Sequence, residues 1–261
     1  MGPAVSALLR MELGKLGRLA SVRFGAVVVV VFPVLWAYAP GIFDVYGFYL
    51  VSGFQVPALA LLSSMEFLLP LLIAITCAEL IGIEISHGTL PTVLLRPVTR
   101  AQWLLAKLLV ATVYPFLALA FFLLASLAAG VVYGFGPFVG GTGLGRAGLL
   151  GAGLTAPGQA WSEVLQAYVI AAYSLVPIGL LAVLFSVLLM NAAGGVLATL
   201  ATLIVMQLLV VFPAVTPFLL TTQLNAYVDP PAPLGWVVAL VAVYGATFAA
   251  TAVVVFERKD F

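Results

Sequence analysis

Six long apolar segments dominate the pattern of hydrophobic and polar positions along this chain. They cover roughly residues 20–39, 57–83, 101–133, 163–190, 193–212 and 235–256. An α-helix rises about 1.5 Å per residue, so about 20 apolar residues cross the hydrocarbon core of a bilayer. Every segment meets that length. The pattern therefore predicts an all-α integral membrane protein, with six transmembrane helices forming a single domain over residues 1–261.

Four prolines lie inside the predicted spans, at Pro33, Pro70, Pro115 and Pro177. Within a membrane bundle, neighbouring helices and local backbone adjustments satisfy the carbonyl groups that a proline frees. We therefore expect each proline to kink its span without ending it.

A different periodicity precedes the first span, within residues 1–20. From residue 4 onward, one arc of a helix collects the apolar side chains Val5, Leu8, Leu9, Leu13, Leu16 and Leu19. The basic residues Arg10, Lys15 and Arg18 fall outside this arc, and Glu12 is the exception to the segregation. This pattern predicts an amphipathic helix at the membrane interface, with its basic groups toward anionic headgroups. The alternative is a water-exposed N-terminal extension.

The composition agrees with a membrane protein and narrows the possible functions. The chain is 64% hydrophobic and 7% charged, with a net charge of +1, whereas soluble domains carry roughly 25% charged residues. No basic patch is large enough to bind nucleic acid. The single cysteine, Cys77, excludes a disulfide framework, and the single histidine, His87, excludes a two-histidine metal site.

Catalytic chemistry also lacks its usual residues. His87 is predicted to lie in a cytoplasmic connection, so no Ser–His pair is available within the membrane. The sequence contains no GxxxxGK[ST] motif, so this chain does not bind ATP through a P-loop. We therefore expect no catalytic residue, no metal and no cofactor on this chain.

The basic residues predict the orientation of the chain. With six spans, nine of the ten fall on one side, namely Arg10, Lys15, Arg18, Arg23, Arg96, Arg100, Lys107, Arg258 and Lys259, and only Arg146 falls on the other. By the positive-inside rule the first side is the cytoplasm, and both termini then lie inside the cell membrane. The outer connections are residues 40–56, 134–162 and 213–234. A tight inner turn over 191–195 joins the fourth and fifth spans.

The cytoplasmic connection between the second and third spans, residues 84–100, has the pattern of a short helix. Thr89 is suited to cap it, and Leu90, Val93 and Leu94 form an apolar face at helical spacing. Pro97 ends the helix, because the residue before a proline disfavours the helical conformation.

A second helix begins directly after this short one. Thr99 and Gln102 have the spacing of a capping box, in which each side chain bonds the backbone N–H of the other residue. The result is a helix–turn–helix elbow with an apolar knob and flanking charges. Such an elbow suits a groove on a soluble partner. The alternative is a loop on the membrane surface that keeps its leucines in the interface.

The same connection resembles the signature of type-2 ABC exporter permeases. The similar residues are Glu84 to Leu90, containing Gly88-Thr89, then Leu94 to Arg100, containing Arg96-Pro97-Val98-Thr99-Arg100, and finally Lys107. The layout is similar too, with an amphipathic N-terminal helix, six spans, cytoplasmic termini and a charged tail. The Gly-rich outer connection, residues 134–162, has no counterpart in that signature.

The resemblance implies a half-transporter that dimerises with an identical or a related copy. Each copy would dock on a cytoplasmic P-loop ATPase, and that partner would bind ATP and Mg²⁺. Segment 84–100 would be the coupling element, carried by Glu84, Gly88, Thr89, Leu90, Leu94, Arg96, Pro97, Arg100 and Lys107. Glu84 and Arg100 would be polar partners at the junction, and the second and fifth spans would face the dimer axis and the substrate path.

Polar residues inside spans are candidates for that path. A charge at the bilayer centre costs roughly 2.5–3.5 kcal/mol on insertion scales, and Glu66 lies about one-third of the way into the second span. It is either a pathway carboxylate or a structural one, hydrogen-bonded to Ser63 or to a facing helix. Thr199, Thr202 and Gln207 in the fifth span are further candidates, although hydrogen bonding between helices is their default role.

Three functional hypotheses follow. The leading one is an ATP-driven exporter subunit, and the scarcity of intramembrane charge favours a hydrophobic or amphipathic cargo. The second is a secondary carrier that works without an ATPase and uses Glu66 as its ion-linked group. The third is a structural subunit of a membrane complex.

Overall fold

The computed structural model describes residues 3–39, 49–86, 99–144, 148–149, 153–228 and 233–259. Six helices in this part are long and apolar enough to cross a membrane. They are α2 (Ala20–Tyr38), α5 (Leu68–Ser86), α7 (Arg100–Gly130), α8 (Pro157–Leu189), α9 (Ala192–Leu209) and α11 (Leu234–Glu257). The all-α prediction with six membrane-spanning helices is confirmed.

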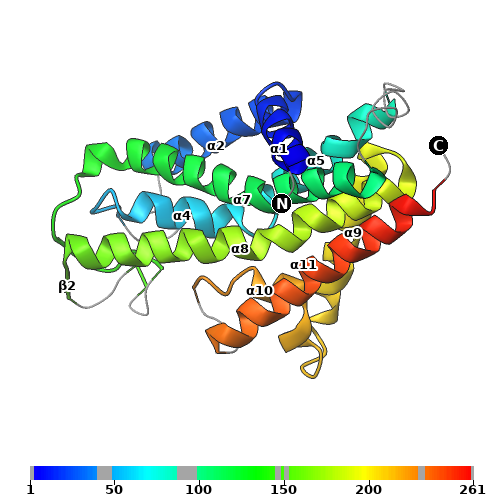
Figure 1. The fold of residues 1–261 in the computed structure, drawn as a ribbon. Helices are drawn as coiled ribbons and strands as arrows, with labels where there is room; N and C mark the ends of the chain where they lie inside the picture. The colour runs from blue at the N-terminus through cyan, green and yellow to red at the C-terminus, as the bar shows by residue number, and fades with distance from the viewer. Residues whose placement is uncertain are drawn as a thin grey trace.

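Helix α8 occupies the centre of the bundle. It packs against α5, α7, α9 and α11, and Figure 1 shows α7 above it and α11 beneath its C-terminal half. The buried share is 78% for the span of α8 but 17% for that of α9. The core is therefore built around α8, while α9 presents most of its apolar surface outward.

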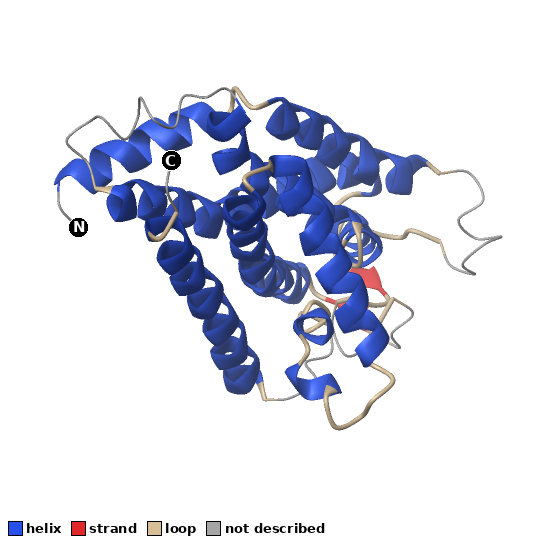
Figure 2. Cartoon of the chain, turned by 90° about the vertical axis from the view of Figure 1, so that its right-hand side faces the viewer, coloured by secondary structure: helices blue, strands red, loops and turns tan. Residues whose placement is uncertain are grey.

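Helix α1 (Pro3–Leu16) lies across the bundle and not along it. Figure 1 shows it nearly end-on, and Figure 2 shows it crossing the bundle near the N-terminus. It packs against α7. Leu9, Leu13 and Leu16 from the predicted apolar arc join the main hydrophobic core, whereas Arg10 and Arg18 are exposed. These three leucines of α1 therefore face protein.

The second predicted span is not one helix. The structure divides the expected segment 57–83 into α4 (Gln55–Ser64) and α5, separated by a turn at residues 65–67. Pro70 therefore lies in the first turn of α5, where its missing N–H removes no intrahelical bond, and not in mid-helix as expected. Glu66 lies in the break between the two helices, and its side chain is exposed.

The end of the bundle farthest from the C-terminus has structure of its own. In the connection predicted over 134–162, β1 (Phe138–Val139) pairs antiparallel with β2 (Leu154–Thr155), and a short 3-10 helix, η1 (Val131–Tyr133), precedes them. That connection also ends earlier than predicted, because α8 begins at Pro157, a residue suited to a first helical turn.

An aromatic cluster packs this far end. The ring of Phe54, which is fully buried, lies 5.0 Å from the Phe135 ring and 5.5 Å from the Trp161 ring. The amide of Gln55 donates a 3.0 Å hydrogen bond to the carbonyl of Gly141. These contacts hold the outer connection against the start of α4 and the first turns of α8.

The remaining connections are compact. Met190, in the left-handed region at φ 54°, and Asn191 alone join α8 to α9, so the predicted turn over 191–195 is shorter than expected. The side chain of Asn191 caps α9 by accepting a hydrogen bond from the N–H of Ala193. Within the predicted connection 213–234 lie two short helices, η2 (Thr216–Phe218) and α10 (Leu220–Gln223).

Candidate functional site

Four charged side chains from three helices meet at one end of the bundle, and we call them the charge cluster: Glu12, Lys15, Glu84 and Lys107. Lys107 Nζ lies 2.9 Å from Glu12 Oε2 and 3.1 Å from Glu84 Oε1. Lys15 Nζ lies 2.7 Å from Glu12 Oε1 and 3.0 Å from Glu84 Oε1. Each lysine thus contacts both glutamates, and the cluster joins α1, α5 and α7.

Lys107 is the buried centre of the charge cluster, with its side chain 1% exposed. Besides the two glutamates, its ammonium group donates a 2.5 Å hydrogen bond to the carbonyl of Leu80. The same nitrogen lies 4.8 Å from the ring centre of Trp103, in a cation–π arrangement. A buried cation needs such full pairing, because each unpaired charge away from water carries a large desolvation penalty.

The cluster also shifts the ionisation of the two residues on α1, which lies outside the spanning segments. Burial by itself raises the pKa of Glu12, but the charge of Lys107 and hydrogen bonds from both lysines outweigh it and leave the pKa below its ordinary value. Burial by itself lowers the pKa of Lys15, but Glu12 and Glu84 outweigh it and leave the pKa raised. Both groups are therefore held in their charged forms.

Glu84 and Lys107, both expected in the coupling element, are thus brought together with α1. Other members of that prediction, Gly88, Thr89, Leu90, Leu94, Arg96 and Pro97, lie outside the described residues. At the start of α7 the capping box is present: Thr99 Oγ1 accepts from the Gln102 N–H, and Gln102 Oε1 accepts from the Thr99 N–H, both at 3.2 Å.

The C-terminal segment is tied to the same end of the bundle. Arg100 donates a 2.9 Å hydrogen bond from Nη1 to the carbonyl of Lys259. Lys259 Nζ in turn donates to the carbonyls of Val187 and Leu188, at 2.8 and 2.7 Å. A lysine at this position satisfies the last carbonyls of α8 and complements its negative end. No pattern in the sequence predicts this contact between the C-terminal segment and the end of α8.

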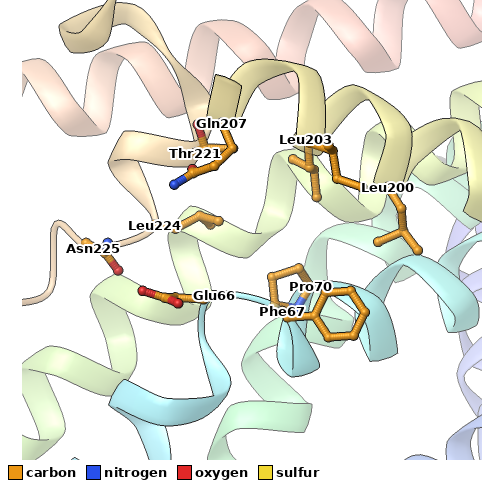
Figure 3. Close-up of a pocket in the computed structure, with 10 residues that line it drawn as sticks. Glu66, Phe67, Pro70, Leu200, Leu203, Gln207, Thr221, Leu224 and Asn225 are labelled. Carbon is orange, nitrogen blue, oxygen red and sulfur yellow. The ribbon is translucent and has the colours of Figure 1, made fainter. Parts of the chain in front are cut away.

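A second candidate site is an open pocket of about 270 Å³ between α5, α9 and α10. It is lined by Glu66, Phe67, Pro70, Leu200, Leu203, Ile204, Gln207, Thr221, Leu224 and Asn225. Figure 3 shows the carboxylate of Glu66 directed toward the side that Asn225 lines. We call this the Glu66 pocket.

The Glu66 pocket brings together two of the four predicted path residues, Glu66 and Gln207. The other two do not line it. The hydroxyls of Thr199 and Thr202 donate to the carbonyls of Gly195 and Ala198, at 2.7 and 2.8 Å, within their own helix. Their donors are therefore satisfied inside α9.

Sequence reasoning missed the contribution of α10 to this pocket. Thr221 is 8% exposed, and its hydroxyl has no hydrogen-bond partner within the part of the chain that the structure describes. Asn225 is exposed and lines the pocket beside it. The available signal was the polar run from Thr221 to Gln223 inside an otherwise apolar connection.

The sequence profile of a family described as "ABC-2 family transporter protein" matches residues 8–156, which is more than half of the chain. The chain belongs to this ABC-2 family. It is a multi-pass membrane protein and a transmembrane permease subunit of an ABC transporter. Membership of the family implies association with an ABC ATPase. No curated protein matches the chain.

The ABC-2 match includes the whole charge cluster and part of the Glu66 pocket. It contains all four members of the charge cluster and, from the Glu66 pocket, Glu66, Phe67 and Pro70. The walls of that pocket contributed by α9 and α10 lie after the matched region. The resemblance seen in the sequence is thus confirmed as membership of the family.

Proposed function

We propose that this ABC-2 subunit is the membrane half of an ATP-driven exporter that works as a dimer. A separate cytoplasmic ATPase binds ATP and Mg²⁺ and docks on segment 84–100 of each copy. The observation that carries this proposal is the charge cluster. It fastens the last turns of α5 and the first turns of α7, the two helices on either side of the coupling segment, to α1.

The mechanical consequence supports a coupling role. A push on a connection between two loosely held helices would be absorbed locally. Here Glu84 on α5 and Lys107 on α7 are joined directly, 3.1 Å apart, and both contact α1. A displacement of the connection therefore moves three helices as one body, because close-packed elements transmit strain. Since α5 also lines the Glu66 pocket, this movement reaches the proposed substrate path.

Orientation follows from the same end of the molecule. The charge cluster, the first turn of α7 and Lys259 gather there, together with most of the basic residues. The positive-inside rule assigns this end to the cytoplasm of the cell membrane, with both termini inside.

The dimer and its path are assigned to the second and fifth spans. Helix α9 presents exposed apolar side chains, including Leu197, Ile204 and Leu208, which suit a second copy or lipid. The Glu66 pocket opens between this helix and α5, with Glu66 and Gln207 as its polar groups. Its predominantly apolar lining fits a hydrophobic or amphipathic cargo.

The test is copurification of the tagged full-length chain with a P-loop ATPase from the same cells. Leu94→Glu places a charge on the predicted apolar knob, so we expect ATPase recovery to fall at least about tenfold. Arg10→Glu, an exposed charge change on α1, is the matched control and should retain the ATPase.

Two results would overturn the proposal. If Leu94→Glu kept both the ATPase and ATP-driven efflux from vesicles, segment 84–100 would not be the docking element. If the wild-type chain carried cargo with no ATPase present, the secondary-carrier hypothesis would replace the exporter.

A further inference from the structure

The Glu66 pocket has an uneven distribution of charge. Of the ten residues that line it, Glu66 alone carries a charge, three are polar and uncharged, and the others are apolar. We propose that this pocket selects cationic amphiphiles, meaning molecules with a positively charged nitrogen or phosphorus centre on a compact apolar body. This inference rests on the proposed function, since it names the cargo class of the proposed substrate path.

Glu66 supplies the negative charge of the pocket. It precedes the first residue of α5 by two positions, close to the partial positive charge at the N-terminus of that helix. Among the described residues that line the pocket there is no lysine or arginine. By contrast, Glu12 and Glu84 in the charge cluster each contact two lysines. Within the described structure, the carboxylate of Glu66 has no basic side chain in salt-bridge contact.

The hydroxyl of Thr221 is a second feature of the pocket wall. This side chain is more than nine-tenths buried, lines the pocket and has no hydrogen-bond partner in the described residues. Buried polar atoms normally have a partner, so an unpartnered one at a pocket wall points to a ligand or water. Together with the amides of Gln207 and Asn225, it supplies oxygen atoms that accept hydrogen bonds from an ammonium group.

The apolar part of the pocket wall determines which ligand bodies fit. Phe67, Leu203 and Ile204 are among the apolar side chains that form the rest of the wall. The ring of Phe67 adds a face that attracts cations. A volume of about 270 Å³ is small for a ligand site, so the body must be compact or extend from the open side into lipid.

These features also exclude the opposite charge. An anionic amphiphile would place its head beside the carboxylate of Glu66, where like charges repel. A neutral amphiphile would leave Glu66 without a counterion after water is displaced. Only a cation satisfies both Glu66 and the apolar wall.

The test uses the full-length chain in nanodiscs of zwitterionic lipid. Two probe ions of nearly equal size and shape, tetraphenylphosphonium and tetraphenylborate, are measured by equilibrium binding, with protein-free nanodiscs subtracted. We expect saturable binding of the cation that weakens about tenfold in Glu66→Gln, as for loss of one ion pair in a partly desolvated site. Binding of the anion should not weaken in the variant.

Matched variants separate the charge from the fold. Glu257→Gln removes an exposed carboxylate on α11 and should leave cation binding unchanged. Glu66→Asp keeps the charge and should retain most of the binding. Thr221→Val is nearly isosteric and should weaken the binding of a primary-amine competitor, such as 4-phenylbutylamine, about threefold.

The outcomes distinguish this inference from the proposed function. If Glu66→Gln bound the cation as tightly as the wild type, or if both ions bound equally, cation selection would be wrong, while ATPase copurification would still support the exporter. If the ATPase failed to copurify but cation binding depended on Glu66, the exporter would be wrong and the pocket would remain a cation site.

Discussion

Two carboxylates near opposite ends of the second predicted span have contrasting environments. The side chain of Glu84 is 13% exposed and contacts Lys15 and Lys107. Glu66 lies in the break between α4 and α5, where it is exposed and lines a pocket whose described residues include no basic side chain. The same residue type is therefore part of a closed ionic structure in one place and faces an open cavity in the other.

The comparison distinguishes charged groups that stabilise the fold from a charged group that lines a binding pocket. Charges in the charge cluster satisfy one another, so removing one of them leaves a buried partner uncompensated. Glu66 makes no salt bridge with any residue that the structure describes, so its removal should affect what enters the pocket and leave the fold intact. Four predictions test this contrast.

The largest expected effect is on Lys107. Replacing it by Met leaves Glu12 buried beside one partly exposed lysine, so we expect the free energy of unfolding to fall by about 3–5 kcal/mol. Thermal unfolding of the purified chain in nanodiscs measures this. The double variant with Glu12→Gln should recover part of the loss, because the uncompensated charge is gone. Equal unfolding temperatures for Lys107→Met and the wild type would mean that the cluster is not structural.

The second prediction concerns pH. Folding lowers the pKa of Glu12, so its ion pairs stabilise the folded state fully above pH 4.5, the ordinary pKa. This stabilisation is lost as the pH falls through the lowered pKa. Folding raises the pKa of Lys15, so its ion pairs stabilise the folded state fully below pH 10.5, the ordinary pKa. This stabilisation is lost as the pH rises through the raised pKa. The unfolding temperature should therefore be flat between these values and fall on both sides. Glu12→Gln should flatten the acid limb, and an unaltered limb would contradict the assignment.

A smaller effect is expected for Lys15→Met. Its side chain is 43% exposed, and partly exposed ion pairs are worth about 1 kcal/mol or less. Chemical denaturation alongside Lys107→Met gives the comparison. A loss as large as that of Lys107→Met would show that burial does not set the ranking of the two lysines.

The smallest expected effect is that of Glu66→Gln on stability. We expect a change within about 0.5 kcal/mol, as for substitutions at exposed positions without a specific partner. The same denaturation assay measures it. A loss above 2 kcal/mol would make Glu66 a structural carboxylate and remove the contrast with Glu84.

The number of spans was readable from the sequence because the length of an apolar run reports directly on membrane crossing. The break at residues 65–67 was not, because Met65 and Phe67 continue the apolar run on both sides of Glu66. Pro70 was a usable cue. Proline is tolerated in a first helical turn, but it fits a mid-span kink equally well in a membrane protein.

The candidate sites divide in the same way. Capping by Thr99 and Gln102 is local, and the sequence predicted it correctly. Glu12 was the one exception to the segregation of apolar and charged residues in the first helix. Its partner Lys107 lies 95 positions away along the chain. No periodicity reports a contact at that separation. The pocket wall from α10 was missed for the same reason, since only the fold brings Thr221 close to Glu66.

The length of α8 has a practical consequence. Its 33 residues extend about 50 Å, whereas the hydrocarbon layer is about 30 Å thick. About 20 Å of this helix must therefore project beyond the hydrocarbon layer, and the paired strands and the rings around Phe54 lie at one of its ends. In the proposed orientation, with both termini inside the cell, this tip faces outward, so an epitope inserted between β1 and β2 should be reachable by antibodies on intact cells and would serve to follow the transporter at the cell surface.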